Sequence, residues 1–292
     1  MNTLSIFRYI PESIIKASAK LLAMFINTQK TSGMLWKTRV NISLCYPSLT
    51  TIEQEKLAKK SVTNQCLYYA NAFKCLAMPI EWNLNQIKNV YNLDTLTEAL
   101  ADAKGTLIII PHLGNWEILN PWVHQYGTPT IMYKPIRNKT INEFILASRN
   151  QLNTTMVPTD SSGVRALFKS LKQGGFSIIL PDHVPAPSGG IIAPFFGINT
   201  LTSTLAPKMI QKTKCCVVSM ICVNSENEEG YSIYLNDVGE QYPEIYNSDI
   251  TISTTAINKV VEDLINQFPE HYMWGYKRFK GSEETKEIYQ QQ

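Results

Sequence analysis

Two short apolar runs constrain the fold of this chain more than any other feature. "TLIII" (residues 106–110) and "FSIIL" (residues 176–180) consist mostly of aliphatic and β-branched residues. Such runs are typical of strands buried on both faces of a sheet. A polar residue comes soon after each run, His112 in the first case and Asp182 in the second. In open parallel sheets the functional site lies at the carboxyl ends of the strands, so we expect these two side chains in one cleft.

The rest of the chain alternates between strand-like and helix-like patterns. Residues 50–103 read as mostly helical, and Gly105 ends that region before the first buried strand. Alternation of this kind predicts an α/β fold with a mixed, largely parallel central sheet flanked by helices on both faces. The other expected strands are 129–135, 156–159, 215–223 and 231–238, the expected helices are 115–127, 140–152, 162–175, 204–214 and 254–274, and 188–197 is expected to be an irregular loop or hairpin.

Length and composition exclude several classes of function. A chain of 292 residues with 44% hydrophobic residues can form a full hydrophobic core in one large domain or two small ones. The net charge of +3 is too small to indicate binding to nucleic acid. The six cysteines form no C-x-x-C pair and none has a histidine at zinc-like spacing, so we expect no metal site and interpret them as buried apolar residues.

The N-terminus is basic and amphipathic. Residues 1–50 carry six basic residues against one acidic residue. The longest apolar run in this region, residues 21–26, is far shorter than the roughly 20 residues of a spanning helix. We therefore predict a membrane-associating helix over residues 1–28 that lies on an anionic surface, followed by one domain over residues 29–292; the alternative is a helix packed on its own domain. The predicted apolar face consists of Phe7, Ile10, Ile14, Ala17, Leu21 and Met24.

The segment "PHLGNWE" (residues 111–117) places a histidine and a carboxylate at a strand end. His112 could act as a general base while Glu117 fixes its tautomer. Positions five apart lie on different faces of a helix, so a tight turn at Gly114 and a helix start at Asn115 would be needed to bring them together. The alternative is that His112 only caps the strand and Glu117 only serves the helix dipole. No G-x-S-x-G elbow and no glycine-rich phosphate loop occurs.

Four sequence blocks resemble the acyltransferase family of lipid A biosynthesis. "PHLGNWE" resembles the H-x4-[D/E] block of glycerolipid acyltransferases, and is most similar to the late acyltransferases of lipid A biosynthesis. The other three blocks follow in the family's order, and the resemblance covers about residues 90–282. They are "YKPIRNKTINEFILASR" (133–149), "SIILPDHVPAPSGGIIAPFFG" (177–197) and "YMWGYKRFK" (272–280).

The resemblance implies a reaction and its partners. A fatty acyl chain would pass from a thioester on acyl carrier protein to a hydroxyl of a phosphorylated glycolipid of the Kdo-lipid IVA type. The enzyme would work without a cofactor at the cytoplasmic face of the bacterial inner membrane. His112 would deprotonate the hydroxyl and Glu117 would orient His112. An oxyanion donor is required, and either Arg149 or a backbone N–H near Gly114 could supply it.

A cationic rim is expected for a phosphorylated acceptor and for an acidic carrier protein. The alternative for these cations is a solvated charged face. The "IIAPFF" segment (191–196) is expected to line the acyl channel rather than the core. Besides the catalytic pair, we expect the substrate-binding residues Asn115, Arg137, Arg149, Asp182, Lys277 and Arg278, with Lys280 as a further rim cation.

One position departs from the family pattern. The family has Asp-Gln after the second buried strand, whereas this chain has Asp182 followed by His183. Successive residues of a strand point to opposite faces, so we expect Asp182 to face the cleft, bonded to backbone or to Arg149. His183 is then expected to pack behind that wall.

Two other functions remain open from the sequence. The acceptor could be another membrane lipid, such as a glycerophospholipid or a mannosylated inositol lipid. The chain could also be a non-catalytic lipid-binding protein, although retention of both His112 and Glu117 argues against that reading.

Overall fold

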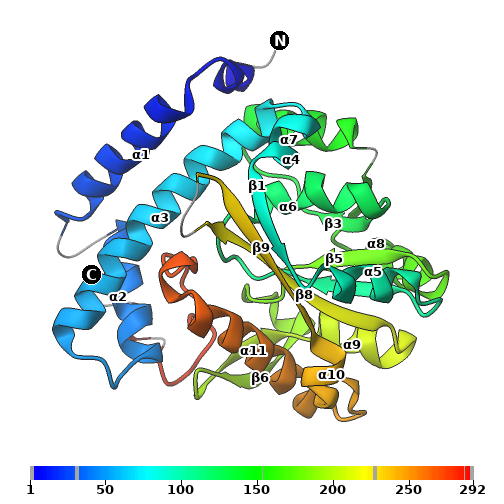
Figure 1. Ribbon diagram of the computed structural model, residues 1–292. Coiled ribbons are helices and arrows are strands. Elements are labelled where there is room, and N and C mark those ends of the chain that lie inside the picture. Colours follow the sequence, from blue (N-terminus) through cyan, green and yellow to red (C-terminus); the bar gives the residue numbers. More distant parts are fainter. Residues whose placement is uncertain (1–2, 30–32, 153, 226–228, 286, 290–292) are drawn as a thin grey trace.

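A computed structural model describes residues 3–29, 33–152, 154–225, 229–285 and 287–289 (Figure 1). At its centre is a seven-stranded sheet in the order β1-β9-β8-β2-β5-β3-β4, in which every pairing is parallel except that of β8 with β9. This confirms the predicted α/β class and the mixed, largely parallel sheet. The strands are β1 (Ile87–Tyr91), β2 (Thr106–Ile109), β3 (Thr130–Tyr133), β4 (Thr155–Pro158), β5 (Phe176–Ile179), β8 (Cys216–Asn224) and β9 (Tyr231–Asp237).

Helices cover both faces of the sheet because the central strands are apolar on both sides. Leu107 and Ile109 of β2 face one hydrophobic cluster, whereas Ile108 faces the other. The first cluster is covered by α8 (Ser161–Lys172), α9 (Leu205–Thr213) and α11 (Ile250–Gln267), and the second by α5 (Leu93–Ala101) and α6 (Trp116–Val123). The long helix α3 (Thr51–Ala77) contributes to both clusters and runs past one end of the sheet (Figure 1).

Two local predictions differ from the structure. Residues 50–103 contain β1 as well as α3, α4 (Ile80–Asn85) and α5; β1 is an edge strand that pairs with β9, and its sequence "IKNVY" carries too few apolar residues to stand out. The closing helix ends at Gln267, because Pro269 disfavours helical backbone at the residue before it. For residues 188–197 the hairpin alternative is correct, and the hairpin of β6 (Gly190–Phe195) and β7 (Ile198–Ser203) continues to Ser203. Between β3 and β4 lies α7 (Lys139–Gln151).

The N-terminal helix is interrupted and packs on the domain. A 3-10 turn, η1 (Thr3–Arg8), precedes α1 (Glu12–Ile26), which lies alongside α3 (Figure 1). The predicted face is not the packed face, since α1 buries Ile15, Ala19 and Ala23 while Leu21 and Met24 are each 66% exposed. α1 is thus apolar on two faces: one packs on α3, and the other, which includes Leu21 and Met24 of the predicted membrane face, is exposed.

The boundary predicted after residue 28 falls between α1 and α2 (Gly33–Cys45), where residues 30–32 lie outside the described residues. Within the described ranges, the helices are each too short or too polar to cross a bilayer.

Candidate active site

The register of the two central strands brings His112 and Asp182 together. β2 and β5 are parallel neighbours, and Ile109 is paired with Ile179. Each strand is followed by an aliphatic residue and a proline, so His112 and Asp182 are both the third residue after the paired ends. The expectation that these side chains share one place at the carboxyl edge of the sheet is confirmed.

His112 and Asp182 form a buried pair with two contacts. The His112 ring nitrogen Nδ1 lies 2.9 Å from Oδ1 of Asp182, and the His112 backbone N–H donates to Oδ2 at 3.1 Å. The side chains are 15% and 1% exposed respectively. Burial alone would raise the pKa of Asp182, but the charge and hydrogen bonds of His112 outweigh it and hold this pKa well below its usual value. An ionised Asp182 accepts the Nδ1 proton, which leaves the Nε2 lone pair of His112 available as a base.

His183 stacks directly on His112, so the prediction that it packs behind the wall was wrong. The two imidazole centroids are 3.7 Å apart with an interplanar angle of 6°, and the Tyr276 ring lies on the other side of His183 at 4.1 Å. β5 ends at Ile179, so strand alternation does not extend to Asp182 and His183. Burial, together with the neighbouring His112, lowers the pKa of His183 to about 4. Its Nε2 is buried without a hydrogen-bond partner.

Glu117 is paired with Arg149 rather than with His112. A guanidinium nitrogen of Arg149 lies 3.6 Å from Oε1 of Glu117, and both side chains are less than one-fifth exposed. The guanidinium also lies 5.3 Å from the centre of the Tyr133 ring. The predicted contact of Glu117 with His112 is therefore absent. Of the two partners expected for Asp182, backbone or Arg149, the structure has the backbone, through the His112 N–H. Because the carboxylate of Asp182 already holds Nδ1, it occupies the place expected for Glu117.

The turn between His112 and α6 depends on Gly114. Its φ is +67°, and a Cβ atom would lie 1.9 Å from the carbonyl oxygen of Cys222 on β8. The backbone N–H groups of Gly114 and Asn115 donate to His271 and Cys222 carbonyls at 2.9 and 2.7 Å. The N–H groups of Gly114 and Asn115 are thus already used within the fold.

Asn115 is at the N-cap position of α6, as predicted, but its side chain makes no capping bond. The residue is 1% exposed and its amide nitrogen lies 3.8 Å from Cys75 Sγ. Asn115 therefore supports the turn from inside, and its predicted role in binding substrate does not fit this position.

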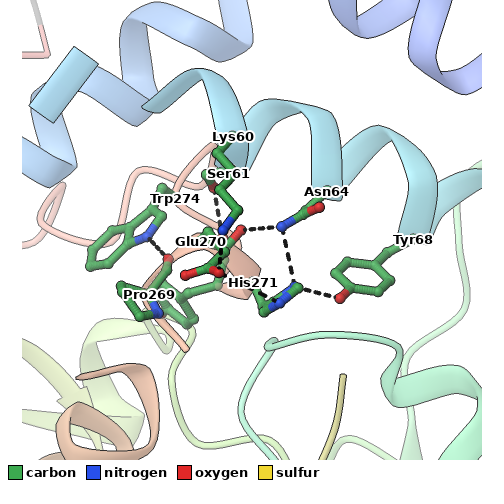
Figure 2. A network of polar contacts seen from close by, with 9 residues as sticks. Lys60, Ser61, Asn64, Tyr68, Pro269, Glu270, His271 and Trp274 are labelled. Carbon is green, nitrogen blue, oxygen red and sulfur yellow. Dashed lines mark hydrogen bonds and ion pairs between the residues drawn. The ribbon is translucent and has the colours of Figure 1, made fainter. Parts of the chain in front are cut away.

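The segment after α11 (residues 269–274) holds the turn that follows β2, here called the catalytic turn (residues 111–115), against α3. Tyr272 and Leu113 form an antiparallel bridge, and the Met273 N–H donates to the His112 carbonyl at 3.0 Å. Figure 2 shows how this segment is attached, with His271 Nδ1 facing both the Tyr68 hydroxyl at 2.5 Å and the Asn64 amide at 3.2 Å. Burial lowers the pKa of His271 to about 4. The sequence reasoning did not identify His271, and only its place beside the "YMWGYKRFK" block could have pointed to it.

The predicted cationic rim is only partly at the surface. Arg278 is 2% exposed, and its guanidinium donates to the Leu201 carbonyl at 3.0 Å and to the Thr202 hydroxyl at 2.9 Å. Lys277 is half-buried over the rings of Trp36 and Tyr289. Both were expected at the rim and instead hold the C-terminal block in place. The sequence could not separate them from exposed cations, because burial of a guanidinium depends on distant partners.

Two other cations are exposed. Arg137 lies in the loop between β3 and α7. The Lys280 ammonium lies 5.2 Å from the Tyr276 ring centre, beside the stacked histidines. Tyr276 also accepts the Val184 N–H at 3.0 Å, and it is a site residue that sequence reasoning missed.

The "IIAPFF" segment does not form a channel. In β6, Ala193 and Phe195 are each 1% exposed, and the Phe195 ring lies near that of Phe279 with centroids 6.0 Å apart. These side chains belong to the core beside α11, so the expectation of an acyl channel here was wrong. The cysteines were predicted correctly as buried residues: five are buried and Cys216 is half-buried.

Comparison with known proteins identifies the class and then the family. The palmitoleoyltransferase of lipid A biosynthesis from Escherichia coli K12 is 22% identical over 253 residues, covering 83% of this chain and 77% of its own length. The lauroyltransferase of the same pathway and organism is 24% identical over 244 residues, covering 82% and 77%. These relatives place the protein in the class of acyltransferases. The chain belongs to the bacterial lipid A biosynthesis acyltransferase family, whose sequence profile matches residues 1–281.

More distant relatives also transfer acyl groups. A phosphatidylinositol mannoside acyltransferase of Mycolicibacterium smegmatis is 24% identical over 209 residues, covering 70% of this chain and 66% of its own. Among solved structures, the 1-acyl-sn-glycerophosphate acyltransferase of Thermotoga maritima aligns with 90% of this chain and 93% of its own, at 12% identity and a TM-score of 0.37.

Proposed function

We propose that this enzyme transfers a fatty acyl chain from acyl carrier protein to a hydroxyl of a lipid A precursor of the Kdo-lipid IVA type. The observation that carries the proposal is the His112–Asp182 pair, in which a buried carboxylate holds Nδ1 at 2.9 Å and leaves Nε2 free to take a proton. The family membership and the lipid A relatives support the substrate class.

The proposed reaction is direct transfer. His112 Nε2 takes the proton of the acceptor hydroxyl as its oxygen attacks the thioester carbonyl. The tetrahedral oxyanion then collapses, the carbon–sulfur bond breaks, and the carrier thiol leaves with the proton from His112. Arg149, fixed by Glu117, is the proposed cation for the oxyanion. In this scheme Glu117 acts through Arg149, and Asp182 positions His112.

Direct transfer also agrees with the state of the thiols. Burial raises the pKa of all six cysteines, to about 12 for Cys75 and about 11 for Cys216. A thiol whose pKa is raised is a poor nucleophile, so an acyl-enzyme on cysteine is not expected. We place the enzyme at the cytoplasmic face of the inner membrane, where the carrier protein and the lipid acceptor meet.

The test is acyl transfer by the purified full-length enzyme, followed by mass spectrometry of the lipid. Addition of one acyl mass to the lipid A precursor is expected. His112→Ala should lower the rate by roughly 10²–10⁴-fold, the usual contribution of a general base. Asp182→Asn should also lower it by at least about tenfold, because an amide does not stabilise the imidazolium.

The matched control is His124→Ala. His124 is another half-buried histidine, bonded to the Asn120 carbonyl at 2.6 Å and the Thr154 hydroxyl at 2.9 Å, and it lies outside the proposed site. This variant should keep its rate within a few-fold of wild type. Transfer to a mannosylated inositol lipid but not to the lipid A precursor would overturn the proposed identity of the acceptor. A His112→Ala enzyme as active as the control would overturn the mechanism.

A further inference from the structure

An apolar groove runs between the N-terminal segment and α3. It encloses about 480 Å³ between η1, α1 and α3, with Met34 of α2 at its margin, and none of its described lining side chains is charged. The hollow exists because small residues face each other across it, Ser18 and Ala19 on α1 and Cys66 and Ala70 on α3. A ligand in this groove is therefore held by apolar contact and not by charge.

The groove is closed at one place and open at another. Phe7 of η1 and Phe73 of α3 are stacked with centroids 5.3 Å apart, and both line the groove. Ile14 and Leu22 also line it, yet they are 55% and 53% exposed. The groove thus opens onto the exposed apolar side of α1. Contiguous exposed apolar surface of this kind marks a binding site for lipid or protein in soluble chains.

A line of aromatic rings connects the groove to the catalytic base. Tyr69 lines the groove, and its ring meets Trp116 edge-on at 6.5 Å. Trp116 in turn meets the His112 ring at 5.2 Å. The Tyr69 hydroxyl also donates to Met273 Sδ at 3.3 Å, which ties the groove wall to the segment that clamps the catalytic turn. Two rings thus separate the groove from His112.

We propose that this groove binds one acyl chain that the acceptor lipid already carries, while the acceptor's reacting hydroxyl lies at His112. This inference rests on the proposed function. A methylene group has roughly the volume of a water molecule, about 30 Å³ in the liquid, so the groove has room for one chain of on the order of a dozen carbons. A second chain or a partner helix would not fit.

The acceptor chain is favoured over the transferred chain by position. The transferred acyl carbon must reach Nε2 of His112, whereas the groove is separated from that ring by Trp116 and Tyr69. The groove also opens toward the exposed apolar residues of α1, where a membrane-resident acceptor would approach. A donor on a water-soluble carrier protein would approach from the aqueous side.

The first experiment measures binding without catalysis. The probe is cis-parinaric acid, a fluorescent fatty acid, titrated into the full-length protein. Ser18→Phe fills the groove from an exposed position, and Ala17→Phe adds the same ring at the next exposed position, which does not line the groove. We expect Ser18→Phe to weaken binding at least tenfold, with Ala17→Phe and His112→Ala within twofold of wild type. Equal affinities for the two phenylalanine variants would overturn the groove as a binding site.

The second experiment identifies which substrate uses the groove. Steady-state rates are measured with an acyl carrier protein donor and a lipid A precursor acceptor. Ser18→Phe should raise the KM for the acceptor at least tenfold and leave the KM for the donor within twofold. A rise confined to the donor KM would overturn the assignment. If no transfer occurs with wild type, the proposed function fails, while the probe titration still decides whether the groove binds an acyl chain.

Discussion

At the scale of single residues, the stacked pair of His112 and His183 limits how much positive charge the candidate site can hold. Two imidazole rings whose centroids are 3.7 Å apart cannot both be protonated to imidazolium cations without strong repulsion. The groups around His183 are His112, Asp182, Tyr276, Lys280 and Arg278, and the net effect of burial and these charges is to lower the pKa of His183 to about 4. His183 therefore stays neutral at physiological pH.

This lowered pKa predicts a loss of stability in acid. Between pH 6.5 and about 4 the unfolded chain binds a proton at His183 that the folded chain does not, so the free energy of unfolding falls as the pH falls through this window. At pH 5 the loss from this one group is about 2 kcal/mol. Urea unfolding of wild type and His183→Gln at pH 7.5 and 5.0 measures it. The variant should lose about 2 kcal/mol less than wild type between the two pH values.

His271→Gln is the comparison for that experiment, because burial also lowers the pKa of His271 to about 4. A similar difference is expected there. If His183→Gln loses as much stability in acid as wild type, the interpretation of His183 as a neutral buried group is wrong.

At the scale of elements, the loop between β2 and α6 is where the site is built. Gly114 brings the loop against β8 so closely that a methyl group would overlap the Cys222 carbonyl, and the segment after α11 holds the loop from the other side. The position of His112 thus depends on three separate elements that meet at one turn.

Gly114→Ala should lower the free energy of unfolding by about 3 kcal/mol or more. About 1 to 2 kcal/mol comes from the left-handed backbone and the rest from displacement of β8. Gly197 is the matched control, since its φ is +75° but nothing lies within 4 Å of its Cβ position. Gly197→Ala should cost only about 1 kcal/mol. Equal losses in urea unfolding would show that the contact with Cys222 contributes nothing.

At the scale of the whole molecule, exposed apolar side chains are concentrated at the N-terminal end. Nine large hydrophobic residues of the described chain are more than half exposed, and all but Ile52 and Ile192 lie in η1, α1 or the turn between them. These seven are Ile6, Tyr9, Ile14, Leu21, Leu22, Met24 and Phe25. α1 uses its other face to pack on α3, so this apolar surface is presented by a helix that is fixed to the domain. A surface of this kind is suited to lie on a membrane.

Leu21→Glu should weaken binding to vesicles that contain phosphatidylglycerol by about tenfold. Removal of one apolar side chain from the bilayer interface costs about 1.5 kcal/mol, and the new charge adds repulsion. Ile252→Glu on α11 is the control, because Ile252 is also an exposed aliphatic residue but lies far from α1 along the chain and on another element (Figure 1). Vesicle sedimentation measures both variants. Equal binding of the two would place the membrane contact elsewhere.

The sequence alone determined the class of fold and the location of the site. Apolar runs of strand length alternate with amphipathic helices, and that pattern requires a sheet covered on both faces. The carboxyl ends of parallel strands lie at the same edge of a sheet. His112 and Asp182 each follow an apolar run of strand length, so they could be placed together at that edge. These are local properties, and each can be read from a few neighbouring residues.

The tertiary structure decided which side chains touch. Asp182 rather than Glu117 contacts His112 because β2 and β5 pair in a register that aligns the two loop positions. Glu117, five residues further along turn and helix, contacts Arg149 instead. Arg278 is buried, and α1 packs on the domain through Ile15, Ala19 and Ala23, because burial depends on partners far along the chain. Contacts of this kind are set by strand register and helix packing, and these follow from the lowest free energy of the whole chain rather than from any one segment.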